Sequence, residues 1–465
     1  MYCKLHTQSL FPFYIRRDHN MQRQKSTLAQ VFNFKEPDAR TRCLLLISIA
    51  LEAVINYITT GIFWTEFLRG YHMQPEEIGI LAFSPFIAGL FVIFAPSLLT
   101  RFKKRRFVLG FCKLMYYTCS IFALTLLPHL VNDSTVLIIC MSVLQFIAYI
   151  FNIIAVSGYA AWHVKFLPES IRAQYMTFNQ FAAALLPGIL VLLAAIYADK
   201  LAAMPADQLK FLEYVRHFGF LLGILDVILL SLPREVDYPV IHTPKFRDII
   251  TIPLSNKKYL LTMVVVFAWQ FSLYCHNTFL QVYLMETIGI TYFLYCFIIF
   301  VYPFFFPFSM KFWQKRIQKT SWLRALAFAL LIEAPLQLLY ALIRPDLAPW
   351  LLVGMLLLVR LPQHFAGVGR NSIVANMQYV NMPEVNRTCY TSFYQIVFNL
   401  GAAAGLLFGT VFVALSKNFA LPLFGYTYEG GIPWLIALSG IIQLGIVAYV
   451  LLMGKRLEPE PETLS

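Results

Sequence analysis

LPESIRAQYMTFNQ, from Leu167 to Gln180, occurs twice in this chain. The second version is MPEVNRTCYTSFYQ, from Met382 to Gln395, and the two stretches are identical at six of fourteen positions. Average residue usage would give about one identity. The offset between the two copies is constant at 215 residues, as between Pro168 and Pro383. The repeat therefore predicts one structural module that is used twice, each copy being nearly half of the chain.

The composition is typical of a membrane protein. Of the 465 residues, 59% are hydrophobic and 13% are charged, whereas a soluble domain carries about 25% charged residues. Apolar runs of about twenty residues recur, and each is long enough to cross about 30 Å of hydrocarbon as a helix. We therefore predict an all-α membrane protein with twelve spans at roughly 43–67, 76–99, 107–130, 135–160, 174–198, 212–232, 259–285, 290–310, 322–343, 347–370, 391–415 and 432–453.

The positions of the basic residues indicate the topology. With a cytoplasmic N-terminus, inside segments hold about 29 of the 37 Lys and Arg residues, and outside loops hold about six, namely Arg69, Lys200, Lys210, Arg216, Arg344 and Lys417. This asymmetry follows the positive-inside rule, and an even number of spans leaves both termini cytoplasmic. We expect a multi-pass protein of the plasma membrane. The net charge of +13 then reflects topology and attraction to anionic lipid, and no nucleic-acid partner is expected.

Polar stretches divide the chain into two halves of six spans. We predict a cytoplasmic N-terminal segment, a first bundle, a cytoplasmic central loop, a second bundle and a cytoplasmic tail, at 1–42, 43–232, 233–258, 259–453 and 454–465. The start of translation is Met1 or Met21. Each half has a basic turn after its second span, and Arg101 and Arg316 in these turns keep the 215-residue offset. Eight scattered cysteines without a C-x-x-C pair support neither a metal site nor a disulfide framework.

With these features the chain resembles the major facilitator superfamily over residues about 40 to 455. The duplicated Pro-Glu loop and the two basic turns carry the resemblance, because parallel six-span repeats are the architecture of that family. The resemblance implies a central cavity lined by spans one, four, seven and ten. Family members usually have a Gly and an Asp before the first basic turn. Here the sequence is APSLLTRFKKRR, so the charge relay of that Asp does not carry over.

Polar residues inside those four spans are the candidate solute- and ion-binding groups. Within each span they recur at helical spacing and so share a face: Glu52, Asn56, Gln145, Tyr149, Gln270, Tyr274, Asn277, Arg360 and His364. Glu52 and Arg360 lie about 14–15 Å deep at 1.5 Å per residue, where a charge costs about 2.5–3.5 kcal/mol. We expect both to face one aqueous cavity, paired directly or through the solute. Glu52 is the first candidate proton carrier and His364 the second; the alternative for each residue is a helix–helix contact.

The repeated stretch contains two acid–base pairs at the predicted cytoplasmic surface. Glu169 and Arg172 of the first copy recur as Glu384 and Arg387 of the second. We predict that these pairs act as gates between the halves. The alternative is that each Pro-Glu starts the next helix, since the N-terminal dipole favours an acid there.

Three further charges and one glycine pattern lie inside the spans. Lys113 is expected to snorkel toward the interface, and Asp226 and Glu333 are expected to be structural. Gly401, Gly405 and Gly409 make a small-xxx-small face that predicts close packing of span eleven against another helix.

These observations favour a secondary transporter that moves a small polar solute by alternating access. Amides and aromatic rings suit a sugar-like solute, whereas Arg360 suits an organic anion. Coupling to H⁺ or Na⁺ is expected, with no cofactor and no metal, in a monomeric protein that is not an enzyme. An ATP-driven pump is disfavoured because no G-x-x-x-x-G-K-[ST] loop occurs. The alternatives are a transporter-like solute sensor and an intramembrane lipid-modifying enzyme.

Overall fold

The computed structural model describes residues 38–102, 104–167, 169–235 and 245–457. This part of the chain is almost wholly helical. Eleven of its helices are long and apolar enough to cross a membrane, and a bent pair of helices adds a twelfth span. The predicted all-α membrane fold is therefore confirmed.

The spanning elements follow one another as the sequence predicts, although several spans consist of more than one piece. In chain order they are α2 (Ala39–Thr59) and α3 (Gly61–Gly70); α4 (Pro75–Leu81), α5 (Ser84–Gly89), η1 (Leu90–Phe94) and α6 (Ala95–Thr100); α7 (Arg105–Tyr117), η2 (Thr118–Ala123) and α8 (Leu124–Leu130); α9 (Ser134–Lys165); α10 (Glu169–Lys200); α11 (Pro205–Ser231); α13 (Lys257–Val282) and η3 (Tyr283–Thr287); α14 (Tyr292–Phe300) and α15 (Tyr302–Lys319); α16 (Trp322–Ala341); α17 (Pro349–Met377); α18 (Arg387–Leu415); and α19 (Ile432–Leu452).

Span eight differs from its prediction as one helix over residues 290–310. Its two parts, Tyr292–Phe305 and Phe308–Lys319, meet at 56°. The sequence YPFFFP places prolines at 303 and 307. Each proline removes a backbone donor and crowds the preceding turn, which kinks a helix. Two prolines four residues apart explain the bend.

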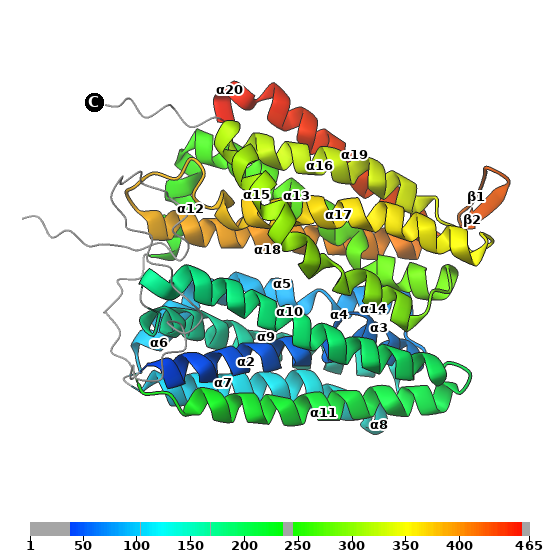
Figure 1. Ribbon diagram of the computed structural model, residues 1–465, viewed down its shortest axis with the longest axis horizontal. Coiled ribbons are helices and arrows are strands. Elements are labelled where there is room, and N and C mark those ends of the chain that lie inside the picture. The colour runs from blue at the N-terminus through cyan, green and yellow to red at the C-terminus, as the bar shows by residue number, and fades with distance from the viewer. Residues whose placement is uncertain (1–37, 103, 168, 236–244, 458–465) are drawn as a thin grey trace, which may run out of the picture.

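The helices form two groups that meet along one seam. In the first group α2 packs on α10 and α11, and α7 packs on α9; in the second, α13 packs on α18 and α19, and α16 packs on α17 and α19. Figure 1 shows the first group, blue to green, below the second, green to red. Contacts across the seam come from α10 against α14 and from α18 against α4 and α5.

The duplicated stretch occupies matching positions in the two groups. The Tyr175 hydroxyl at the start of α10 donates to the carbonyl of Arg42 on α2, at 3.0 Å. Tyr390, its counterpart 215 residues later, lies at the start of α18, where its carbonyl accepts from the Tyr259 hydroxyl of α13 at 2.8 Å. In both groups, therefore, the repeat joins the fifth span of the group to its first.

The glycine face of span eleven packs as predicted. A Cβ atom at Gly401, Gly405 or Gly409 would lie 2.8, 2.4 and 2.1 Å from the carbonyl oxygens of Phe267, Phe271 and Cys275 on α13. Real Cβ atoms do not approach an oxygen so closely, so only glycine permits this contact between α13 and α18.

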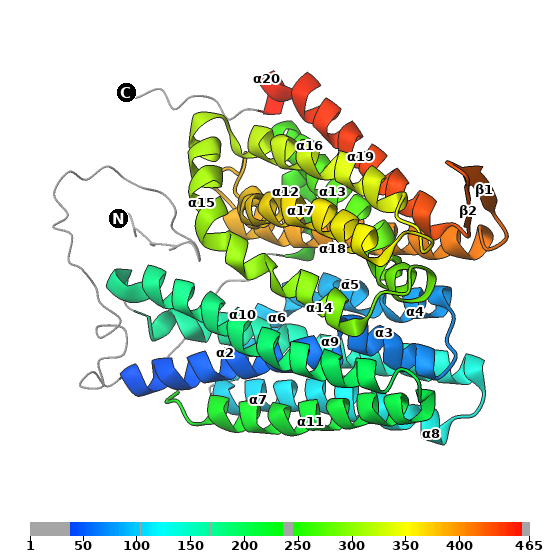
Figure 2. The same ribbon diagram turned by 45° about the vertical axis from the view of Figure 1, so that its right-hand side comes forward.

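Three short elements lie outside the spans and were not predicted. They are α12 (Phe246–Ser255) in the central loop, α20 (Gly454–Leu457), and a hairpin of β1 (Ala420–Leu423) and β2 (Tyr426–Glu429), paired from Ala420–Glu429 to Leu423–Tyr426. Figures 1 and 2 show the start of α2 at one end of the molecule and the hairpin at the other, and Figure 1 shows α12 and α20 toward the end where α2 starts. We call these the α12 end and the hairpin end.

Candidate functional site

Span one breaks in the middle of the molecule. Helix α2 ends at Thr59, Thr60 is extended at φ −123° and ψ −171°, and α3 starts at Gly61 with φ +56°. A positive φ is available to glycine at no steric cost, so Gly61 permits the turn. The Asn56 carbonyl accepts from both the amide and the hydroxyl of Thr60, at 3.0 and 2.6 Å. Irregular backbone at membrane depth is tolerated where it is buried in protein or lines a cavity.

Arg216 of α11 holds this break in place. Its guanidinium donates to the Thr59 carbonyl at 3.0 Å, to the Ser120 carbonyl at 3.0 Å and to the Thr125 hydroxyl at 2.7 Å. The side chain is 1% exposed and also lies 4.5 Å from the ring centroid of Trp64. The assignment of Arg216 to an outside loop is therefore wrong. A planar fork with five donors can satisfy carbonyls on two spans at once.

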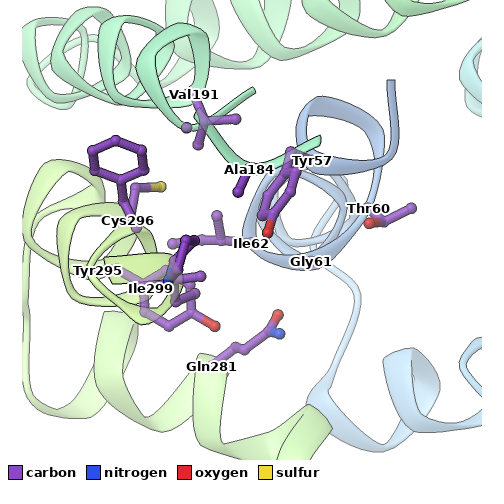
Figure 3. Close-up of a pocket in the computed structure, with 13 residues that line it drawn as sticks. Tyr57, Thr60, Gly61, Ile62, Ala184, Val191, Gln281, Tyr295, Cys296 and Ile299 are labelled. Carbon is purple, nitrogen blue, oxygen red and sulfur yellow. The ribbon is translucent and has the colours of Figure 1, made fainter. Parts of the chain in front are cut away.

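One pocket lies beside the break, between spans one, five, seven and eight. This Tyr57 pocket, of about 170 Å³, is lined by Tyr57, Thr60 and Gly61 of span one, by Gln281 of α13, by Tyr295 of α14 and by apolar residues. Figure 3 shows Tyr57 beside Ala184 with its hydroxyl pointing toward the middle of the pocket, and the Gln281 amide and Tyr295 on the opposite side from Val191.

A second pocket lies on the other side of Thr60, between spans one, two, three, four and seven. This Tyr149 pocket, of about 180 Å³, is lined by polar and aromatic residues that include Thr60, Trp64, Tyr116, Ser120, Gln145, Tyr149, Tyr274 and Thr278. Three of them, Gln145, Tyr149 and Tyr274, are predicted binding residues. The structure thus brings these three together at the seam between the two groups.

Glu52 does not line either pocket and belongs to a buried charge cluster. Lys113 of α7 lies 3.0 Å from Glu52 of α2 and 2.9 Å from Asp226 of α11. Asp226 also accepts from the hydroxyls of Ser48 and Tyr117. Lys113 is only 4% exposed, so the prediction that it snorkels to the interface is wrong. Its ammonium joins three spans, and Glu52, with a side chain 30% exposed, is the accessible member of the cluster.

Arg360 and His364 are engaged within the second group. Arg360 donates to the Tyr340 hydroxyl at 3.2 Å and to the Gln363 amide oxygen at 3.3 Å. His364 Nε2 donates to the Ile298 carbonyl at 2.8 Å, close to the bend in span eight. The direct pairing of Glu52 with Arg360 that the sequence suggested is absent here, since each of these two described residues has other partners. Neither Arg360 nor His364 is among the residues lining the two pockets.

The other candidates lie apart from the pockets. Gln270 is fully buried against Gly401 of α18, and neither its amide oxygen nor its amide nitrogen has a hydrogen-bond partner. Asn277 is exposed, and Asn56 contributes its backbone carbonyl to the break in span one. Glu333, expected to be structural, accepts from Arg370 of α17 at 2.5 Å.

Of the predicted gating pairs, one is described. Glu384 and Arg387 form an i,i+3 ion pair of 2.9 Å at the start of α18, with side chains 90% and 45% exposed. This contact is local to one helix entry and does not cross the seam. The side chains of Glu169 and Arg172 lie outside the described part of the structure.

A different set of polar contacts crosses the seam at the hairpin end. Among residues whose side chains are both described, the hydrogen bonds and ion pairs between the two groups all lie there: Thr65 with Gln281, Glu66 with Tyr292, Arg69 with Glu286, Glu76 with Lys417, and Asp199 with the amides of Tyr292 and Phe293. No pattern in the sequence predicted this set. One feature of the sequence could have indicated these contacts. Spans one and seven are counterparts in the repeat, and they carry opposite charges near their ends at the hairpin end.

The fold and site define a polytopic helical membrane protein whose two matching bundles enclose polar, aromatic pockets at their seam. The sequence profile of the Major Facilitator Superfamily matches residues 45–406. The chain belongs to this family. No curated protein matches the chain.

Solved structures share the fold at low sequence identity. The nucleoside transporter NupG aligns with 11% identity and a TM-score of 0.64, over 90% of this chain and 99% of its own. A bacterial homologue of the human lysosomal transporter Spinster aligns with 14% identity and a TM-score of 0.61, over 89% and 97%. The E. coli fucose:proton symporter FucP aligns with 15% identity and a TM-score of 0.54, over 91% and 100%.

Proposed function

We propose that this protein is a secondary transporter that moves a small polar solute across the plasma membrane by alternating access. The observation that carries the proposal is the position of the two pockets. Both lie at the seam between the bundles and both include Thr60, where span one breaks. A solute bound there touches both bundles, so its binding responds to their relative position.

The polar contacts across the seam support a state that is closed at the hairpin end. Arg69 of the first bundle is ion-paired with Glu286 of the second, and Glu76 is paired with Lys417. In the orientation that the positive-inside rule favours, the α12 end and both termini face the cytoplasm. The hairpin end is then extracytoplasmic, and these ion pairs separate when the protein opens outward.

Glu52 is the proposed proton carrier of the cycle. Two carboxylates, Glu52 and Asp226, share the single ammonium of Lys113, so the cluster holds one negative charge in excess. Asp226 is fully buried, whereas Glu52 is partly exposed and can exchange a proton with water.

The test is uptake by the protein in liposomes, with and without an imposed pH gradient, for wild type, Glu52→Gln and Asp207→Asn. Asp207 is a matched control because its side chain is 54% exposed at the start of α11, away from the seam. The probes are sugars, nucleosides and organic acids. We expect gradient-driven uptake that Glu52→Gln abolishes and Asp207→Asn retains.

Other outcomes of the same experiment separate the parts of the proposal. Equal uptake by all three proteins would reject Glu52 as the coupling site and leave the transporter. Saturable binding of a probe, without uptake in any condition, would instead identify a transporter-like sensor.

A further inference from the structure

We infer that the solute is an uncharged, ring-bearing polar molecule of the sugar or nucleoside type, held where the Tyr57 and Tyr149 pockets meet at Thr60. The inference rests on the proposed transport function and narrows its substrate class. It decides between the two classes that the sequence left open, a sugar-like solute and an organic anion.

The charge of the lining excludes an anion from this place. Among the described residues that line the two pockets there is no Asp, Glu, Lys, Arg or His. Arg360, the residue that would favour an anion, is bonded to Tyr340 and Gln363 instead. Removing a charge from water without a partner costs several kcal/mol, whereas a neutral polar molecule needs only hydrogen bonds.

Aromatic side chains give the pockets flat walls. In the Tyr149 pocket the ring of Tyr149 lies 5.8 Å from that of Tyr116, and the ring of Tyr274 lies 4.5 Å from that of Phe86. Trp64 lines the same pocket. Such faces suit a base or the apolar face of a sugar ring, since aromatic surfaces combine a large contact area with a preferred stacking geometry.

An unused acceptor in the pocket points to a hydroxyl or N–H donor on the ligand. Gln145 is 7% exposed and interacts with Tyr149, yet its Oε1 has no hydrogen-bond partner. A buried polar atom without a partner costs about 1–3 kcal/mol, which a ligand donor would recover. Gln281 and Thr278 add polar groups around the rings.

The size of the site agrees with one small ring compound. The pockets measure about 170 and 180 Å³ and share Thr60. Each is smaller than the ~300–1,000 Å³ of a typical small-molecule site, so only a small ring compound suits it. Thr60 can line both pockets because span one breaks at Gly61, and Arg216 holds this break in place.

The test is binding to the purified full chain, followed by tryptophan fluorescence and by the shift in unfolding temperature. The probes are uridine and D-xylose as uncharged ring compounds, and 2-oxoglutarate as an anion. The variants are Gln145→Ala and, as a matched control, Gln443→Ala, because Gln443 is a buried amide of α19 outside both pockets. Each titration is repeated at ~0.1 M and ~1 M salt, where the Debye length falls from about 10 to 3 Å.

We expect uridine or D-xylose to bind with an affinity that does not depend on salt, and Gln145→Ala to weaken that binding at least tenfold while Gln443→Ala leaves it unchanged. Salt-sensitive binding of 2-oxoglutarate that Gln145→Ala does not affect would overturn the inference, as would failure of both uncharged probes to bind. Failure of the proposed transport function would give a different result. The uncharged probe would bind independently of salt and would be weakened by Gln145→Ala, but it would not enter liposomes.

Discussion

The buried cluster around Lys113 gives the sharpest test of what holds the first bundle together. Lys113→Met replaces the ammonium by an apolar side chain of similar length. It removes the charge partner of both Glu52 and Asp226, which lie 3.0 and 2.9 Å away. Removing one member of a buried ion pair typically costs about 3–5 kcal/mol, because the remaining charge is buried without compensation.

Most of that loss should come from Asp226. This carboxylate is fully buried and keeps only the hydroxyls of Ser48 and Tyr117 as donors, whereas Glu52 is partly exposed to water. Asp226→Asn in the Lys113→Met background removes the stranded charge and retains both hydroxyls. We therefore expect the double variant to recover more than half of the stability, with a coupling energy of about 2–3 kcal/mol between the two sites.

The assay is thermal unfolding of the solubilised protein. Wild type, Lys113→Met, Asp226→Asn and the double variant are measured under the same conditions. Lys113→Met should lower the midpoint by on the order of 10 °C. Lys210→Met is the control, because Lys210 has a side chain 65% exposed and a 3.9 Å contact to Asp207, and surface pairs contribute about 0–1 kcal/mol. The reasoning would be refuted if Lys113→Met were as stable as Lys210→Met, or if the double variant were less stable than Lys113→Met.

Three further variants test other parts of the structure. Gly409→Ala places a Cβ 2.1 Å from a backbone oxygen of α13 and should destabilise by about 1–3 kcal/mol, whereas Gly445→Ala, with open space around it, should be neutral or slightly stabilising in thermal unfolding. Arg69→Ala removes an ion pair across the seam, so we expect an impermeant maleimide to label native Cys296 in the Tyr57 pocket faster, as read by mass spectrometry. An unchanged labelling rate would contradict the role of this ion pair in closing the hairpin end. Arg216→Lys keeps the charge but loses the fork that holds the break in span one, so we expect a raised KM for uptake and a lower unfolding midpoint; an unchanged KM would argue against a positioning role.

Features that depend on local or periodic pattern were predictable from the sequence. The 215-residue offset predicted that both halves use one module, and Tyr175 and Tyr390 occupy matching junctions. The face periodicity of spans four and seven selected Gln145, Tyr149 and Tyr274, which line one pocket. These predictions needed only the spacing of residues along one helix.

Features that depend on how helices are rotated against one another were not predictable. The positions of Glu52 and Arg360 along their helices predict a depth near the midplane. Their partners are Lys113 and Tyr340, on neighbouring spans whose rotation the sequence does not specify. The break in span one was also missed, because a single glycine such as Gly61 inside an apolar run is compatible with a continuous helix.

The placement of charges separates contacts that must persist from contacts that must break. Each bundle contains buried ion pairs that join its spans: Lys113 joins three spans of the first bundle, and Glu333, with a side chain 2% exposed, joins α16 to α17 in the second. Across the seam the Arg69–Glu286 pair has side chains 26% and 34% exposed, and exposed pairs contribute about 0–1 kcal/mol each. Breaking the Arg69–Glu286 pair therefore costs less than breaking a buried pair inside a bundle, because water can replace the lost partners of Arg69 and Glu286. This order of energies is what a movement of two rigid bodies about a shared pocket requires.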